Sequence, residues 1–293
     1  MSTPPFLDPP PGTRAYRLPT ARGELAVLDT SPPAGRPDRA PAVLVPGFTG
    51  SKEDFIAVLG TLSAAGHRAV ALDLRGQHES PAAGNPDGEA AYSVDEFGLD
   101  VLAVIEALGD GPVHLLGHSF GGLVARSATL AARAAIRSLA LLGSGPGPVP
   151  GASADRAALM LRALDQYDLP TIWEAMQAAY AADGNKPPAD PEIGRFLRRR
   201  FLANSPACLR AIARQLLETP DRVGELAGTG VPMLVAHGVD DDAWPPELQA
   251  EMAERLGAHR VAIPGAAHSP AAEQPEQTAA ALTGFWASAE RAG

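Results

Sequence analysis

The sequence has little of several features that particular classes of protein need. It contains one cysteine, Cys208, so no disulfide can form within the chain and the signature of an oxidising compartment is lacking. No apolar run approaches the roughly 18 residues that cross a bilayer. The opening stretch MSTPPFLDPPPG has neither the basic nor the apolar region of a secretory signal, and its prolines predict an extended or loose segment. These absences predict a cytoplasmic protein without a membrane partner.

Concentrated positive charge is also lacking. The net charge is −10, and lysines and arginines are scattered apart from the run RFLRRRF at 195–201, which we expect to be the solvated face of a helix. A nucleic-acid partner would require a basic footprint, so none is predicted. No metal-ligand cluster, phosphate-binding loop or dinucleotide fingerprint occurs in the sequence, and we predict neither a metal nor a cofactor. The oligomeric state is left open.

Aromatic residues are few, but the 45% hydrophobic content is enough for a substantial core. Short apolar runs alternate with amphipathic segments along most of the chain. The expected strands are a hairpin around Arg22-Gly23, whose two strands are expected to alternate between buried and exposed residues, and the runs 42–47, 67–76, 112–119, 136–145, 232–238 and 259–265. The expected helices are 51–66, 93–109, 120–134, 246–257 and 275–291. This alternation predicts an α/β fold with a mostly parallel central sheet and helices on both faces.

The alternation stops between residues 146 and 230. That stretch contains helical patterns at 153–165, 170–182, 191–202 and 206–217, separated by proline and glycine, and no clear strand. We therefore predict a core domain made of residues 1–145 and 231–293, with residues 146–230 inserted as a helical unit.

Functional residues are sought directly after strands, because ligands bind at the carboxyl ends of the strands in open parallel sheets. The sequence GHSFG, residues 117–121, follows one predicted strand and opens a helix. In that strand–turn–helix context, G-x-S-x-G places a serine on a sharp turn where flanking glycines avoid steric clashes. Ser119 is the predicted nucleophile.

A serine needs a base and an acid that orients the base. Of the seven histidines, His268 is the one we expect to be the base, because it follows the last strand in the short loop PGAAHSP. We expect His118 to point away from the reaction and to pack beneath the site. Three aspartates at 240–242 follow the preceding strand, and at most one of them is the acid. The amide N–H groups of Phe48 and Phe120 are the predicted oxyanion donors.

With these residues in view, the chain resembles the α/β-hydrolase-fold enzymes over nearly its whole length. The order nucleophile, acid, histidine is that family's order. HGVDDDAWPP resembles the family's acid loop, and this resemblance selects Asp241 because it lies three residues after Gly238 and four before Pro245. DLRGQHES resembles a family loop, with His78 where glycine is commoner, and VPGFTGS resembles the oxyanion turn, with Pro46 in place of the usual histidine. The insertion at 146–230 resembles the family's cap domain.

The resemblance implies a serine hydrolase that cleaves a carboxylic ester, lactone or thioester of a small-molecule acyl substrate through an acyl-enzyme. His78, Trp173 and Trp244 are candidates for lining its pocket. Acyl transfer, carbon–carbon bond hydrolysis or cofactor-free perhydrolysis would use the same triad. A small-molecule receptor with weak catalysis is the alternative from outside the enzymes.

Overall fold

The structure is a computed structural model, and it describes residues 1–35, 39–83, 88–184 and 186–292. Within those ranges, eight strands form one sheet in the order β1-β2-β4-β3-β5-β6-β7-β8. β1 and β2 form an antiparallel hairpin, β2 is antiparallel to β4, and the remaining neighbours run parallel. The strands are β1 (Thr13–Thr20), β2 (Gly23–Thr30), β3 (Ala42–Val45), β4 (Ala69–Leu72), β5 (Val113–His118), β6 (Ile136–Leu142), β7 (Met233–Gly238) and β8 (His259–Ile263).

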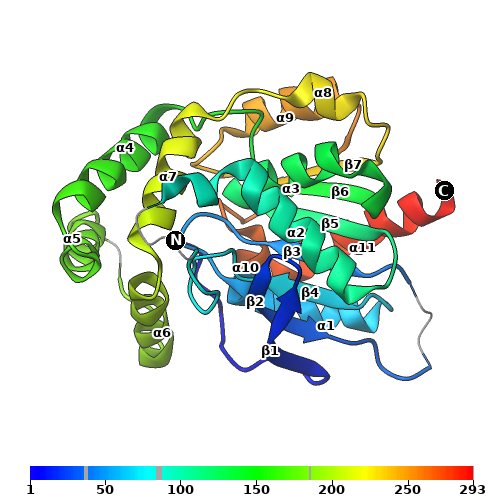
Figure 1. Cartoon of the computed structure of the whole chain (residues 1–293), viewed down its shortest axis with the longest axis horizontal. Helices are drawn as coiled ribbons and strands as arrows, with labels where there is room; N and C mark the ends of the chain where they lie inside the picture. Colours follow the sequence, from blue (N-terminus) through cyan, green and yellow to red (C-terminus); the bar gives the residue numbers. More distant parts are fainter. Residues whose placement is uncertain (36–38, 84–87, 185, 293) are drawn as a thin grey trace.

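Helices cover both faces of this sheet (Figure 1). On one face α1 (Ile56–Ala64) packs against α10 (Pro270–Glu273) and α11 (Pro275–Ala292). On the other face lie α2 (Val94–Leu108), α3 (Phe120–Ala131) and α9 (Pro246–Leu256). Three short 3₁₀ helices in the described residues, η1 (Lys52–Phe55), η2 (Glu89–Tyr92) and η3 (Arg133–Ala135), occupy connections.

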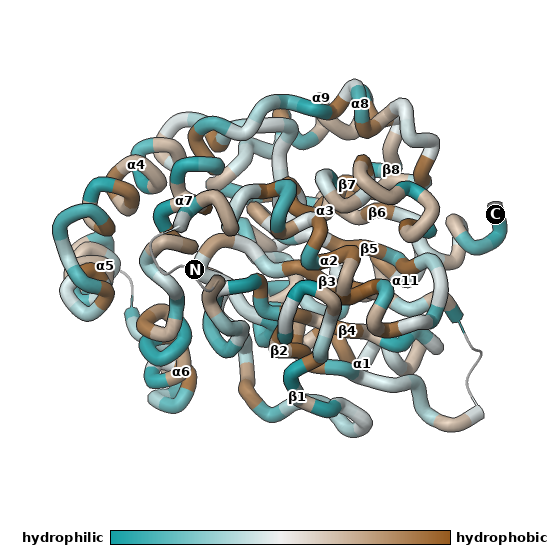
Figure 2. Tube along the Cα trace, viewed as in Figure 1, coloured by the Kyte–Doolittle hydropathy of each residue, from teal (hydrophilic) through white to brown (hydrophobic). Residues whose placement is uncertain are grey.

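The central strands are apolar on both sides because both sides are covered. Every residue of β3, β4, β5 and β7 is buried. Within β3 the side chains alternate between the two layers: Val43 and Val45 belong to the core under α2 and α3, whereas Ala42 and Leu44 belong to the core under α1 and α11. Figure 2 shows the resulting hydrophobic centre beneath a more polar exterior.

Five helices lie between β6 and β7 in the described part of the chain, namely α4 (Gly151–Gln166), α5 (Leu169–Ala182), α6 (Pro191–Leu202), α7 (Pro206–Glu218) and α8 (Val223–Ala227). α4 packs on α7, and α5 packs on α6, at one end of the sheet (Figure 1). Their shared apolar cluster includes Trp173, Phe196 and Phe201. α8 instead packs on α9 and α3 of the core, although it falls inside the predicted insertion of residues 146–230.

Two expectations need correction. β2 was expected to alternate between buried and exposed residues, but Leu25–Thr30 are all buried, because β2 lies between β1 and β4. The run 195–201 does not lie wholly on a solvated face, since the Arg200 side chain is fully buried and its guanidinium donates a hydrogen bond to Asp54 at 2.7 Å. The opening segment, residues 1–12, has no helix or strand and is mostly exposed, as expected, but Ser2 is buried and its carbonyl accepts a hydrogen bond from Arg200.

No helix in the described ranges combines the length and the apolar character that crossing a membrane would require.

Candidate active site

Ser119 occupies the turn between β5 and α3, with φ 56° and ψ −124°. A positive φ is uncommon for a residue with a side chain, and it is the kind of strain that clusters at functional sites. The turn is possible because its glycines leave room. A Cβ on Gly117 would lie 2.1 Å from the carbonyl oxygen of Gly121, and a Cβ on Gly121 would lie 2.4 Å from that of Val45. The G-x-S-x-G spacing therefore has a steric cause in this fold.

His268 joins the serine to an acid. Its Nε2 lies 2.9 Å from Ser119 Oγ, and its Nδ1 lies 2.9 Å from Asp241 Oδ1. Because the carboxylate can only accept, Nδ1 carries the proton and Nε2 presents a lone pair to the serine hydroxyl. The serine follows β5, the aspartate follows β7 and the histidine follows β8, so the parallel sheet brings the three together at its carboxyl edge.

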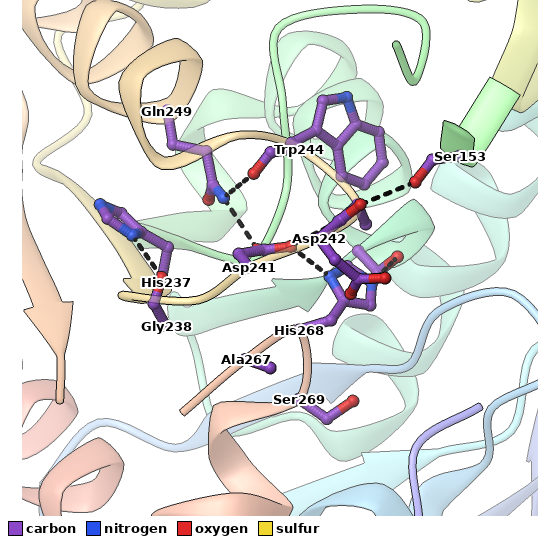
Figure 3. Close-up of polar contacts among 12 residues, drawn as sticks. Ser153, His237, Gly238, Asp241, Asp242, Trp244, Gln249, Ala267, His268 and Ser269 are labelled. Carbon is purple, nitrogen blue, oxygen red and sulfur yellow. Dashed lines mark hydrogen bonds and ion pairs between the residues drawn. The ribbon is translucent and has the colours of Figure 1, made fainter. Parts of the chain in front are cut away.

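Asp241 is held on both carboxylate oxygens (Figure 3). Oδ1 accepts hydrogen bonds from the amide N–H of Ala243 and from His268 Nδ1, each at 2.9 Å, and Oδ2 accepts one from Gln249 Nε2 at 2.8 Å. Burial alone would raise the pKa of the Asp241 carboxyl. The hydrogen bond from His268, the positive charge of that ring when protonated, and the hydrogen bonds from Ala243 and Gln249 outweigh burial and hold the pKa below its ordinary value. Asp241 is thus a carboxylate at neutral pH.

The two neighbouring aspartates point elsewhere. Asp240 is exposed, and the Asp242 carboxylate is paired with Arg156 at 3.0 Å. The structure therefore brings Asp241 alone of the three into contact with His268. Gln249 was not anticipated, because a glutamine on an amphipathic helix carries no signal of what its amide contacts.

The predicted oxyanion turn lies directly against the nucleophile. A Cβ on Gly47 would lie 2.8 Å from Ser119 Cβ and 3.3 Å from its Oγ, so only glycine allows this approach. Phe48 follows it on the pocket wall, and Phe120 is the first residue of α3. A helix N-terminus leaves its first amide groups without helical partners, which suits an oxyanion.

A cavity of about 410 Å³ opens over Ser119 and His268. Trp244 lines it as predicted. The other apolar walls come mainly from the inserted helices: Val149, Ala157, Met160, Met176 and Leu216. Charged side chains at the cavity are Asp54, Arg156, Asp242 and Glu273.

His78 and Trp173 are not among the residues that line this cavity. His78 packs edge-on against Phe196 with ring centroids 5.6 Å apart, and burial lowers the pKa of its imidazole to about 4. Its φ of 44° explains why glycine suits that position of the loop. Trp173 packs against Phe201 within the apolar cluster of the inserted helices.

His118 is buried beside His268, in keeping with the expectation that it packs beneath the site, but it does not point away from the site. It lines the same cavity, and its Nε2 lies 2.7 Å from the main-chain oxygen of His268. Burial lowers the pKa of the His118 imidazole to about 3, so the ring is neutral at physiological pH. Since a carbonyl can only accept, Nε2–H is the donor in this hydrogen bond.

Among the residues that the structure describes, two groups of side chains have ligating atoms close enough for a metal ion: His67, His114 and Glu290, and Glu53, His78 and Glu79. In each group a basic side chain already neutralises the carboxylates. Arg39 pairs with Glu290 at 2.8 Å, and the Lys52 ammonium pairs with Glu53 and Glu79 at 2.9 and 2.8 Å. A cation would have to displace these partners, so neither group is favoured as a metal site.

Comparisons with known proteins identify the family of this chain. The family model of the alpha/beta hydrolase family matches residues 42–281. The RutD protein of Variovorax paradoxus (strain S110), whose name proposes carbamate hydrolysis, is 30% identical over 227 residues, which are 76% of this chain and 82% of that protein. A non-heme haloperoxidase of Rhodococcus erythropolis is 27% identical over 82% of this chain and 89% of its own.

Among solved structures, a thermophilic esterase from Thermogutta terrifontis superposes with a TM-score of 0.74 at 24% identity, covering 94% of this chain and 99% of that one. Because the two sequences are only 24% identical, this structural similarity shows the fold alone. The family match covers most of the sheet and its surrounding helices, including all three residues of the hydrogen-bonded chain from Ser119 to Asp241. The chain is a hydrolase that belongs to the alpha/beta hydrolase family.

Proposed function

We propose that this hydrolase cleaves an ester-type bond, a carboxylic ester, lactone or thioester, through a serine nucleophile and an acyl-enzyme. The observation that supports it most strongly is the continuous chain of two 2.9 Å hydrogen bonds from Ser119 through His268 to Asp241. This arrangement supplies a nucleophile, a base within reach of its proton and an acid that fixes the tautomer of the base.

The reaction then follows from the positions of the protons. His268 Nε2 takes the proton of Ser119 Oγ as that oxygen attacks the carbonyl carbon, and the Asp241 carboxylate stabilises the imidazolium that forms. The amide groups of Phe48 and Phe120 donate to the developing oxyanion. The imidazolium gives its proton to the leaving alkoxide or thiolate, which departs and leaves the acyl group on Ser119. Water, deprotonated by His268, attacks the acyl-enzyme and releases the acid.

The inserted helices are proposed to act as a cap that shapes the substrate pocket. Their contribution to the cavity wall is apolar, with methionine, leucine, valine and alanine side chains opposite the triad. Asp54 is paired with Arg200 and Asp242 with Arg156, so the described side chains at the cavity offer no unpaired lysine or arginine to a negatively charged substrate. A neutral ester with a short or medium apolar acyl group fits these walls best.

A panel of p-nitrophenyl esters tests this assignment. We expect kcat/KM to be highest among the acetate, butyrate and hexanoate and to fall for the dodecanoate, because the cavity measures only about 410 Å³. A hemisuccinate ester, matched in length to the butyrate but carrying a carboxylate, is expected to react more slowly. Failure of every neutral ester to react would contradict the proposed function.

A carbamate is the second candidate substrate class. It is favoured by the relative named RutD, and it presents the same carbonyl carbon with nitrogen on one side. Including a p-nitrophenyl carbamate in the panel separates the two, since faster turnover of the carbamate than of the matched ester would shift the assignment.

The acid assignment predicts a large difference between adjacent aspartates. Asp241→Asn is expected to lower kcat about 10⁴-fold, because an amide no longer fixes the His268 tautomer or stabilises its positive charge. Asp240→Asn, which changes an exposed neighbour, is expected to stay within about threefold of wild type. Steady-state kinetics on the best ester measures both, and the reverse order would move the acid role to Asp240.

A further inference from the structure

The main chain around His268 is bound from two sides by side chains outside the triad. Glu273, at the end of α10, accepts hydrogen bonds from the amide groups of Ala267 and Ser269, the residues that flank the histidine. The Ser269 bond measures 3.0 Å. His118 donates to the carbonyl oxygen of His268 itself, at 2.7 Å. Three consecutive residues of the loop are therefore tied to the rest of the fold.

Among the described residues, the Glu273 side chain makes no hydrogen bond beyond these two, although it also lines the cavity. It is exposed, and the ion pairs formed within residues 1–35, 39–83, 88–184 and 186–292 do not include it. Each of its two carboxylate oxygens accepts a hydrogen bond from one amide N–H of the loop. A carboxylate that accepts two amide N–H groups in this way braces the peptide between them, and charge-assisted bonds of this kind are stronger than neutral ones.

The second tie links the base to the nucleophile. His118 and Ser119 are consecutive, and they contact the main chain and the side chain of His268 respectively. The bond from His118 is protected, because its side chain is buried and its ring lies 5.0 Å from the ring of His268. Any shift of the histidine loop relative to the serine turn must break one of these contacts.

We propose that Glu273 and His118 are positioning residues that hold the main chain of His268, so that its imidazole stays within proton-transfer distance of Ser119. This inference rests on the proposed function, since it gives the two side chains a role only if His268 is the base. Misplacing a reacting group by about 1 Å costs about 100-fold in rate, which sets the scale of the expected effect.

The first test compares Glu273→Ala with Glu276→Ala. Glu276 is an exposed carboxylate in the first turn of α11, so it is a matched control for charge and location. For Glu273→Ala we expect kcat on the best neutral ester to fall ten- to 100-fold, with KM within twofold of wild type and a melting temperature equal to that of Glu276→Ala. Glu273→Gln is expected to be intermediate, because an amide oxygen can accept one of the two N–H groups but its NH₂ cannot accept the other.

The second test uses the donor on His118. His118→Gln is expected to retain most of kcat, because an amide N–H can reach the same carbonyl, whereas His118→Leu should lose about tenfold or more. This rescue distinguishes a lost hydrogen bond from a merely altered core. If either alanine or leucine variant fails to fold, the two glutamine variants still test the proposal against wild type, with Glu273→Gln slowed and His118→Gln nearly unchanged.

The outcomes separate this inference from the proposed function. If wild type hydrolyses esters and Glu273→Ala matches Glu276→Ala in kcat, the positioning role is wrong and the serine hydrolase stands. A Glu273→Ala variant that changes KM but not kcat would also overturn it, since that result places Glu273 in substrate binding instead. If wild type neither hydrolyses an ester nor reacts with a fluorophosphonate, both proposals fail.

Discussion

Replacing Ser119 with alanine is expected to lower kcat on a p-nitrophenyl ester by about 10⁶-fold, the scale at which a serine hydrolase loses its covalent pathway. The change removes one oxygen at a site where the backbone already carries a side chain at φ 56°, so the fold should tolerate alanine as it tolerates serine. The melting temperature is expected to stay at or near the wild-type value.

Ser153 supplies the matched control for that variant. It also lines the cavity, but its hydroxyl donates to the main-chain oxygen of Asp242, away from His268. Ser153→Ala should therefore remain within about tenfold of wild type, since the hydrogen bonds that its hydroxyl donates to Asp242 and accepts from Arg156 do not involve the triad. Loss of activity in Ser153→Ala with full activity in Ser119→Ala would place the nucleophile elsewhere.

Replacing His268 with alanine is expected to cost about as much as losing the serine, because nucleophile and base act as one unit. Without the imidazole, Ser119 has no group to take its proton, and the Asp241 carboxylate loses the group it orients. We expect kcat to fall about 10⁶-fold, measured with the same ester and with thermal unfolding as a check on the fold.

The nearest histidine cannot replace it. His118 Nε2–H is engaged with the carbonyl of residue 268, and burial lowers the pKa of its ring to about 3, so it is a poor proton acceptor near neutral pH. The His268→Ala variant is therefore expected to fall far below His118→Leu. Activity above about one hundredth of wild type in His268→Ala would mean that another residue is the base.

Much of the site was predictable because it depends on strand ends. Ser119, the aspartates at 240–242 and His268 each follow a strand whose apolar run is visible in the sequence, and a parallel sheet places such positions at one edge. The choice of Asp241 among the three aspartates came from the resemblance to the α/β-hydrolase family. The order of strands in the sheet is not visible in this way: β3 lies between β4 and β5, an arrangement set by crossover connections and not by local pattern.

The errors concern side chains whose surroundings come from distant segments. His78 was placed in the pocket because its loop follows a strand, but α6 covers it through Phe196. Arg200 was expected to be solvated with the other arginines of the run 195–201, but its side chain on α6 is buried and pairs with Asp54. Gln249 donates a hydrogen bond to Asp241, and Glu273 accepts hydrogen bonds from the loop that carries His268. No sequence pattern predicts either contact. Packing of the inserted helix α6 on the core decides the cases of His78 and Arg200, whereas Gln249 and Glu273 lie on α9 and α10 of the core itself.

The central claim, that Ser119 is an activated nucleophile, is tested most directly by intact mass spectrometry after exposure to a fluorophosphonate. We predict one adduct per wild-type chain, no adduct on Ser119→Ala, and much slower labelling of His268→Ala, since the serine must be deprotonated to attack phosphorus. An adduct that persists on Ser119→Ala, or its absence from folded wild type, would contradict the account.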